Sequence, residues 1–352
     1  MTSKTATFEI AGRPIGPDYP PYIIAEISAN HQGKLEKALT LLEAAAATGA
    51  DAIKIQTYTA NTITIPHGSE EFRIKGGLWD GYLLYDLYKE AETPFEWHAA
   101  LFAKARELGI TIFSTPFDET AVDLLASLAA PAYKIASFEV IDLPLIAYVA
   151  KQGKPMIIST GMANLGEIQE AVETARANGA GGVALLHCTS AYPAPIEEAN
   201  VRTVAHLGEA FGVVSGLSDH APGSAACVAS TVLGGSIIEK HFTISRDDGG
   251  PDAAFSLEPP EFRKLVDDCK SAWSALGAVG YNLTPSEQGS TLFRRSIYAV
   301  KPIKAGQILT ADNVRSIRPG FGLPPKHLPE IVGRKAARDI AYGEALTWSA
   351  IA

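Results

Sequence analysis

The chain has 352 residues with 30 basic and 39 acidic side chains, and the resulting net charge of −9 argues against general nucleic-acid or membrane-surface binding. Apolar residues make up 47% and charged residues 20%, a composition typical of a globular enzyme and not of a disordered chain. We expect a cytoplasmic protein with no membrane segment and no disulfides, because the sequence has no secretion signal, no apolar run near the roughly 18 residues that a membrane helix needs, and three scattered cysteines.

Short apolar runs alternate with helix-like segments over the first 280 residues. We predict eight strands, at 22–27, 51–56, 110–114, 132–136, 155–159, 183–188, 213–217 and 236–240. Helical patterns at 34–47 and 95–108 are closed by Gly49 and Gly109, because glycine commonly stops a helix. This alternation predicts an α/β fold, a (β/α)8 TIM barrel over residues 1–280. An open doubly wound sheet is the alternative, which the lack of G-x-G-x-x-G after the first strand disfavours.

The connection between the second strand and the next clear helix, residues 57–93, is abnormally long. A loop of this length inside a compact domain is usually functional. It follows the carboxyl end of a strand, so we expect it to lie over the mouth of the barrel. A purely structural flap is the alternative.

The pattern changes after residue 280. Residues 281–292 are polar and turn-rich, which indicates a linker, and residues 293–352 form a small β-rich domain. This domain contains a weak repeat, in which IKAGQIL at 303–309 matches IAYGEAL at 340–346. A unit of this size has little stability alone, so we expect it to pack on something, with a partner barrel as the natural candidate.

Polar and ionisable side chains gather at the carboxyl end of nearly every predicted strand. Barrel enzymes build their active sites at this end, so we expect the site there. The residues are Glu26, Lys54, Gln56, Ser114, Thr115, Lys134, Ser137, Glu139, Ser159, Thr160, His187, Thr189, Ser190, Ser218, Asp219, His220, Glu239, Lys240 and His241.

Two lysines, Lys54 and Lys134, lie in otherwise apolar strands. A buried ammonium needs an anion, because an unpaired one is costly. The lysines therefore either pair with Glu26 or Glu139, grip a small anion such as a phosphate or carboxylate, or form a Schiff base. Ser137, Ser159 and Ser218 add neutral donors around the same anion, although each serine alone is more often a capped strand end.

Two histidines, His220 and His241, close consecutive strands. Their side chains can converge on one divalent metal in an open site, with Asp219 and Glu239 as residues that orient the imidazoles. Such a metal would polarise a carbonyl. Asp252, in the loop after the last strand, is either a solvated acid or an acceptor for substrate hydroxyls. Arg318 in the small domain is, on its own, equally well explained as a surface residue.

At these motifs the sequence resembles the sialic acid synthases, enzymes with a barrel followed by an antifreeze-like (SAF) domain. The matching segments are IIAEISANHQG, GADAIKIQTY, FSTPFD, YKIASFE, ISTGM, GLSDH and EKHFT in the barrel, and RPGFGL in the tail. The match covers essentially the whole chain in order. The segment KGGLWDGYLLYDLYKEAETPFEWH resembles the pseudaminic acid branch more than the N-acetylneuraminate branch.

The resemblance implies a transferase that condenses phosphoenolpyruvate with an open-chain amino sugar, a 2,4-diacetamido hexose in that branch. It implies that Glu26 orients substrate and handles protons, and that His220 and His241 bind Mn²⁺, with Mg²⁺ or Co²⁺ as alternatives. It implies a domain-swapped homodimer in which Arg318 reaches over the partner's barrel. The implied phosphoenolpyruvate contacts are Lys54, Thr115, Lys134, Ser137, Ser159 and Ser218, and the implied sugar contacts are Gln56, Glu139, Tyr192 and Asp252.

Three alternatives stay open. The first is an N-acetylneuraminate or legionaminate synthase that uses another amino sugar, and the second is a Schiff-base aldolase. The third is a carbohydrate-binding protein without catalysis, an alternative that the antifreeze-like tail suggests.

Overall fold

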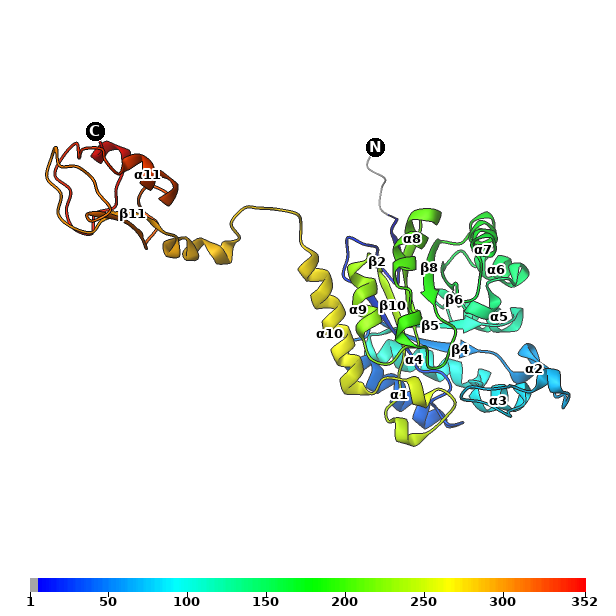
Figure 1. Cartoon of the computed structure of the whole chain (residues 1–352). Helices are drawn as coiled ribbons and strands as arrows, with labels where there is room; N and C mark the ends of the chain where they lie inside the picture. Colours follow the sequence, from blue (N-terminus) through cyan, green and yellow to red (C-terminus); the bar gives the residue numbers. More distant parts are fainter. Residues whose placement is uncertain (1–5) are drawn as a thin grey trace. The chain divides into compact units, whose positions relative to one another are not determined.

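The computed structural model describes residues 6–352 and contains two compact units, the first ending at Gly277 and the second running from Ala278 to Ala352. In Figure 1 the first unit is a barrel surrounded by helices, and the second consists of short strands, short helices and loops.

The first unit confirms the predicted TIM barrel. Its parallel strands close in the order β10, β3, β4, β5, β6, β7, β8, β9. The closing pair runs from Ile237 opposite Tyr22 to His241 opposite Glu26. All eight strands lie within two residues of their predicted bounds. They are β3 (Tyr22–Glu26), β4 (Ala52–Thr57), β5 (Thr111–Pro116), β6 (Tyr133–Ile135), β7 (Pro155–Ser159), β8 (Gly182–Cys188), β9 (Val214–Asp219) and β10 (Ile237–His241).

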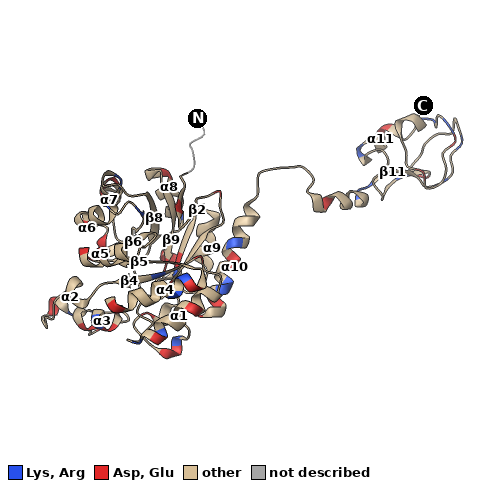
Figure 2. Cartoon of the chain, turned by 180° about the vertical axis from the view of Figure 1, so that it is seen from behind, with Lys and Arg blue, Asp and Glu red and all other residues tan. Residues whose placement is uncertain are grey.

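Helices cover the outside of the barrel, and the colours in Figure 2 show acidic and basic residues interspersed along them, for example on α1 and α10. Asn164 begins α7 by accepting hydrogen bonds from the backbone N–H groups of Gly166 and Glu167. Gly109 ends α4 in the left-handed conformation, as predicted. Within residues 6–352, no helix is long and apolar enough to cross a membrane. The helices are α1 (Leu35–Ala47), α4 (His98–Leu108), α5 (Glu119–Ser127), α6 (Leu143–Ala150), α7 (Leu165–Ala177), α8 (Arg202–Phe211), α9 (Ala225–Val232) and α10 (Pro259–Leu276).

Side chains alternate along each strand between the barrel interior and the layer between strands and helices. Ile23, Ile53 and Leu185 face outward and pack in the main core beneath the helices. The lower interior is apolar and contains Tyr22, Ile24, Ala52, Phe113, Ile157, Ala184, Leu186, Val214 and Ile237. Because the period of a strand is two, the next inward positions toward the carboxyl ends carry the polar residues of the site.

A short antiparallel hairpin precedes the barrel and is absent from the elements predicted above. Strand β1 (Phe8–Ile10) pairs with β2 (Arg13–Ile15), and β1 packs against β7 and β8. Ile10 and Ile15 join the lower interior cluster. Strands of three residues carry almost no periodic signal, which explains why the sequence pattern does not reveal them. The hairpin fills the amino end of the barrel.

The long connection after β4 is structured. It contains the helices α2 (Ala60–Ile63) and α3 (Leu84–Ala91), which Figure 1 places beyond the end of β4. Between them, residues 73–83 form a small hairpin, in which the N–H of Ile74 donates to the carbonyl of Tyr82 and the N–H of Gly81 donates to the carbonyl of Ile74, both at 2.9 Å. Gly76 and Gly77 turn the hairpin with positive φ, a conformation that explains the KGG sequence.

The second unit is built around its internal repeat. Strands β11 (Ser296–Ala299) and β12 (Val314–Ile317) pair antiparallel. The two isoleucines that begin the repeats, Ile303 and Ile340, exchange both backbone hydrogen bonds, at 2.9 and 2.8 Å. Most of the stretch predicted as a linker, residues 281–292, lies in a 3-10 helix, η7 (Pro285–Phe293). The apolar repeat positions, including Leu309 and Leu346, form the core of this unit.

Candidate active site

A cavity of about 380 Å³ lies at the carboxyl ends of the barrel strands. Lys54, Lys134, His220 and His241 all line it, so the structure brings together the two lysines and two histidines on which the sequence analysis depends. The other predicted residues in its lining are Gln56, Ser137, Glu139, Ser159, Tyr192, Ser218 and Asp252.

Two predicted contacts, Glu26 and Thr115, lie behind the cavity wall and not in it. Glu26 is fully buried, forms an ion pair with Lys54, and accepts a hydrogen bond from the N–H of Ser28 at 2.7 Å. The hydroxyl of Thr115 accepts a hydrogen bond from Lys54 at 3.3 Å. Both residues therefore act on the cavity through the ammonium group of Lys54.

Strand alternation turns four of the other polar strand-end residues away from the cavity. Ser114, His187, Asp219 and Lys240 alternate with inward residues and face the layer beneath the helices, so our expectation that all strand ends contribute to the site is wrong for these four. Ser114 bonds to Thr57, and Lys240 pairs with Asp219 at 2.6 Å.

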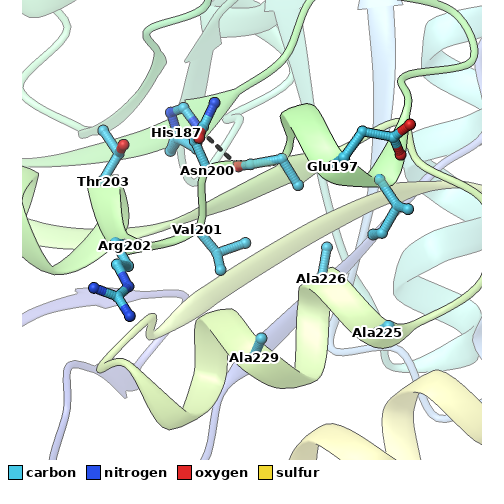
Figure 3. A pocket seen from close by; sticks show the side chains of 11 residues that line it. His187, Glu197, Asn200, Val201, Arg202, Thr203, Ala225, Ala226 and Ala229 are labelled. Atoms are coloured by element: carbon cyan, nitrogen blue, oxygen red, sulfur yellow. Dashed lines mark hydrogen bonds between the residues drawn. The ribbon is translucent and has the colours of Figure 1, made fainter.

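Outward-facing His187 belongs to a different hollow, a groove of about 660 Å³ between the segment before α8 and helix α9 (Figure 3). Its Nε2 is hydrogen-bonded to the carbonyl of Ala199 at 2.9 Å. Burial lowers the pKa of His187, which keeps the imidazole neutral. The groove is separate from the lysines and histidines of the cavity, because none of them lines it.

The two lysines share one carboxylate, Glu239. Its Oε1 lies 3.4 Å from Nζ of Lys54 and 3.6 Å from Nζ of Lys134, and it accepts a hydrogen bond from Ser218 at 3.2 Å. Lys54 also pairs with Glu26, as one alternative predicted, whereas the partner of Lys134 is Glu239 and not Glu139. Glu239 forms no hydrogen bond with either imidazole, so our expectation that it orients a histidine is wrong. Its carboxylate pairs with the two lysines instead.

Burial and charge act in opposite directions on this cluster. Burial disfavours the carboxylate of Glu239, but Lys134 and Lys54 lower its pKa to about 2. Burial also disfavours the ammonium of Lys54, yet Glu239 and Glu26 raise its pKa. Burial lowers the pKa of Lys134, and Glu239 offsets only part of that effect. With two ammonium groups against two carboxylates, the cluster is locally balanced without a substrate.

Serine hydroxyls border the same part of the cavity. Ser159 accepts a hydrogen bond from Lys134 at 2.7 Å, and Ser137 accepts one from the N–H of Gly161 at 3.2 Å. A Cβ atom on Gly161 would lie 2.2 Å from Oγ of Ser190 and 2.8 Å from Oγ of Ser137. The glycine of the ISTGM segment is therefore required by the close approach of two hydroxyl groups.

The imidazoles of His220 and His241 lie with their ring centres 5.3 Å apart. Nδ1 of His220 is 3.0 Å from the carbonyl of Thr189, so this nitrogen carries the proton and leaves Nε2 with a free lone pair. Nδ1 of His241 is buried without a hydrogen-bond partner among the described residues and lies 3.3 Å from Oδ2 of Asp252. Asp219 bonds to Lys240 and the backbone of Ala221, so the prediction that it orients an imidazole directly is wrong.

These nitrogens fit a divalent metal in an open site. Two imidazoles with available lone pairs are borderline ligands and the nearby carboxylate is a hard one, a combination that fits Mn²⁺ or a similar divalent ion. No group of three His, Cys, Asp or Glu residues converges on one point within residues 6–352, so a bound ion would complete its coordination with water or substrate.

Cys188 lines the cavity and is missing from the predicted site. Its Sγ lies 3.9 Å from Nδ1 of His220. Burial favours the neutral thiol, but the hydrogen bond with His220 lowers its pKa below the ordinary value. The signal was present in the sequence, because Cys188 stands two residues after inward-facing Leu186 and therefore shares its face of the strand.

The connection after β4 supplies much of the cavity wall. The sequence predicted that this connection lies over the mouth of the barrel, but not which of its residues line the cavity. Ile63, Ile74, Trp79, Leu84 and Leu87 from this connection line the cavity. Tyr58 packs edge-on against Tyr88 and Phe117, and all three also line it. The functional alternative for residues 57–93 is thus supported by their position.

Arg318 lies in the second unit, where its guanidinium is 6.0 Å from the ring centre of Phe293, and its role stays a prediction.

Comparison with known proteins agrees with this architecture. Residues 41–281 match the NeuB family and residues 294–352 match the SAF domain, and the chain belongs to the NeuB family. It is 45% identical to a pseudaminic acid synthase of Campylobacter jejuni over 325 residues, which are 92% of this chain and 95% of the relative. It is 44% identical to a pseudaminic acid synthase of Helicobacter pylori over 320 residues, or 91% and 94% of the two chains.

A solved relative shares the fold. The N-acetylneuraminic acid synthetase of Leptospira borgpetersenii, in complex with citrate, superposes with a TM-score of 0.73 at 30% sequence identity. The superposition covers 82% of this chain and 96% of that one. The predicted family resemblance and the predicted SAF domain are therefore confirmed.

Proposed function

We propose that this chain is a transferase that condenses phosphoenolpyruvate with 2,4-diacetamido-2,4,6-trideoxy-L-altrose to give pseudaminic acid and phosphate. The observation that carries the proposal is the single cavity in which Lys54 and Lys134 lie close to His220 and His241. The names of the most similar relatives support the choice of sugar.

The reaction forms a C–C bond and breaks a C–O bond. C3 of phosphoenolpyruvate attacks the aldehyde carbon of the sugar, and the aldehyde oxygen takes a proton to become a hydroxyl. Water adds to C2 of the former enolpyruvate, losing a proton, and the phosphate leaves with its bridging oxygen. One pyruvyl unit is thus added to the sugar, one water is consumed and one phosphate is released.

The lysine side of the cavity suits the donor. Lys54 and Lys134 supply two buried ammonium groups as donors of charge-assisted hydrogen bonds to a phosphate or a carboxylate, and such contacts are strong away from water. Ser137 and Ser159 add hydroxyl donors. Holding the donor beside the aldehyde in a fixed orientation lowers the barrier by up to about 7–11 kcal/mol.

Other residues of the lining suit the sugar. Gln56, Glu139, Asp252 and Tyr192 offer polar groups for hydroxyls and amides, and the aldehyde would bind beside His220 and His241. A divalent metal on these histidines would polarise the aldehyde oxygen. Glu26 sets the charge and position of Lys54, with which it is paired. Because phosphoenolpyruvate is a cytoplasmic metabolite, we infer that the enzyme works there.

The test is phosphate release from phosphoenolpyruvate with three sugars side by side. The diacetamido-altrose, the diacetamido-mannose of the legionaminate route and N-acetylmannosamine are compared at equal concentration, with a no-sugar control. Fastest turnover with the first sugar supports the proposal, and fastest turnover with either of the others replaces it with that synthase. Sugar binding without phosphate release from any of the three would indicate a binding protein.

Metal dependence and the Schiff-base alternative are tested on the same preparation. Treatment with EDTA abolishes phosphate release if His220 and His241 hold a required ion, and readdition of Mn²⁺, Mg²⁺ or Co²⁺ identifies the one that restores it best. The pKa of Lys134, lowered by burial, makes this lysine the one to examine for a Schiff base. A covalent lysine adduct trapped by borohydride would favour the aldolase.

A further inference from the structure

Five apolar residues of the connection after β4 line the cavity. They are Ile63, Ile74, Trp79, Leu84 and Leu87, which we call the acceptor wall. Four of these side chains have no polar atom. The single polar atom of Trp79, Nε1, donates to the carbonyl of Pro251 at 3.0 Å, so its hydrogen-bonding capacity is already used. These five side chains therefore offer no hydrogen-bond partner to a ligand, and the polar atoms that the connection does present to the cavity are the hydroxyl groups of Tyr58 and Tyr88.

Ring contacts connect the acceptor wall to the histidines. Trp79 is carried by the hairpin 73–83, and its ring packs against Tyr192 with centres 5.4 Å apart. The ring of Tyr192 in turn packs against His220 at 4.3 Å. The hydrogen bond from Trp79 to the carbonyl of Pro251 also joins the wall to the loop that carries Asp252. Trp79 is thus the residue at which the wall meets the loops after β8 and β10.

We propose that the acceptor wall selects sugars whose C6 is a methyl group over sugars that carry a hydroxyl there. The inference rests on the proposed function, since the donor on the lysine side leaves the wall to the sugar. A methyl group gains by leaving water for an apolar surface. A hydroxyl at the same place loses its water partners and finds none.

The experiment compares two acceptors that differ only at C6, the diacetamido-trideoxy-altrose and its 6-hydroxy counterpart. The ratio of their kcat/KM values is measured for the wild type, Leu84→Asn and Ile74→Thr, with melting temperatures to confirm folding. We expect the wild type to favour the 6-deoxy sugar by about 10–200-fold, the range for one small group in an apolar pocket. Both variants should reduce this ratio at least threefold, through the KM for the sugar, while the KM for phosphoenolpyruvate stays the same.

Two further variants separate selection from general support of the fold. Leu78 lies next to Trp79 but is 45% exposed and outside the cavity lining, so Leu78→Asn is the matched control and should keep the wild-type ratio. Trp79→Leu keeps an apolar surface but loses the bond to Pro251, so it should raise the KM for the sugar and keep most of the ratio.

The possible failures are distinguishable. If the wild type releases phosphate with neither acceptor, the proposed function is wrong. If the wild type is active and folded Leu84→Asn and Ile74→Thr both keep its ratio, or if both sugars react equally well, the function stands and the acceptor wall does not select at C6.

Discussion

The ammonium group of Lys240 lies 2.6 Å from Oδ2 of Asp219, and the side chains of this pair are only 0 and 4% exposed. Each residue stands directly before a cavity histidine, Asp219 before His220 and Lys240 before His241. The pair also binds both backbone groups of Ala221, since Asp219 accepts from its N–H at 3.0 Å and Lys240 donates to its carbonyl. The pair therefore fixes the spacing of the two histidines from the layer between the strands and the helices.

The first prediction concerns this pair. Asp219→Asn should lower the free energy of unfolding by about 3–5 kcal/mol, because it leaves the ammonium of Lys240 buried without a charged partner. It should also weaken Mn²⁺ binding by about 10-fold or more, as changes around metal-binding histidines commonly do. Calorimetric titration of the metal-free protein measures the second effect apart from activity.

A double variant separates charge from position. Asp219→Leu with Lys240→Met replaces the ion pair by apolar groups and should recover most of the lost stability. If Mn²⁺ affinity stays weak in this stable variant, the ion pair positions the histidines. Wild-type affinity in the double variant would show that the pair serves stability alone.

The second prediction concerns Glu239, the carboxylate between the two cavity lysines. Glu239→Gln should lower the free energy of unfolding by about 3–5 kcal/mol at neutral pH, because two buried ammonium groups lose their shared anion. Phosphate should restore part of the loss, since an anion that binds only the folded protein stabilises it. Urea unfolding with and without phosphate measures both effects.

The matched control is an exposed ion pair on α10. Lys264 and Asp268 are 2.7 Å apart, but the side chain of Lys264 is 71% exposed. Asp268→Asn should change stability by less than about 1 kcal/mol. A Glu239→Gln protein that is no less stable than this control, or that gains nothing from phosphate, would show that the lysines do not form an anion site.

The third prediction is a pH dependence. Burial raises the pKa of Glu139 to about 7. The ionised carboxylate accepts hydrogen bonds from sugar hydroxyls and amides, so the KM for the sugar should fall as the pH rises through about 7. Glu139→Gln should remove this inflection, whereas the exposed Glu170→Gln should retain it. A persisting inflection in Glu139→Gln would assign the titration to another group.

The same shift predicts how stability depends on pH. The pKa of an unperturbed glutamate is about 4.5, so between about 4.5 and 7 the folded protein binds more protons at Glu139 than the unfolded chain does. The contribution of Glu139 to the free energy of unfolding must therefore fall as the pH rises through this window. Urea unfolding at several pH values should show a flatter decline for Glu139→Gln than for the wild type.

The fourth prediction tests the proposed exchange of SAF domains in a homodimer. Arg318→Ala and His241→Ala should each lose activity and stay folded. If Arg318 acts on the partner's barrel, co-expression of the two variants creates heterodimers with one intact site, and about a quarter of all sites become active. Two barrel variants, Lys54→Met and His241→Ala, form the control pair and should not complement. Activity that never exceeds that of the parents would place Arg318 on its own barrel or outside the site.

The barrel and the centre of its site were predictable because two simple rules apply to them. Alternating strands and helices indicated the fold, and polar residues at strand ends located Lys54, Lys134, His220 and His241. The same rule included Ser114, His187, Asp219 and Lys240 incorrectly. Strand parity would have excluded them, since each is one residue out of step with an inward neighbour.

The pairing of charges was not predictable. Whether Lys134 meets Glu139 or Glu239 depends on the stagger between strands, which no local pattern specifies. The contact between Trp79 and Pro251 joins two loops that are far apart in the sequence. The β1–β2 hairpin is too short for periodicity to reveal. The features that could not be predicted are thus contacts between distant parts of the sequence, or strands that are very short.

The filled lower end of the barrel has a kinetic consequence. The β1–β2 hairpin and the layer of Tyr22, Phe113 and Ile157 occupy that end, which leaves the carboxyl ends of the strands as the side from which reactants reach the lysines. Gln56, which we assign to the sugar, stands two residues beyond Lys54 on β4 and so lies nearer to that entrance. A sugar that arrives first would obstruct the path of the three-carbon substrate. The geometry therefore favours a compulsory sequence of events, with phosphoenolpyruvate entering first and the aldose sealing it in.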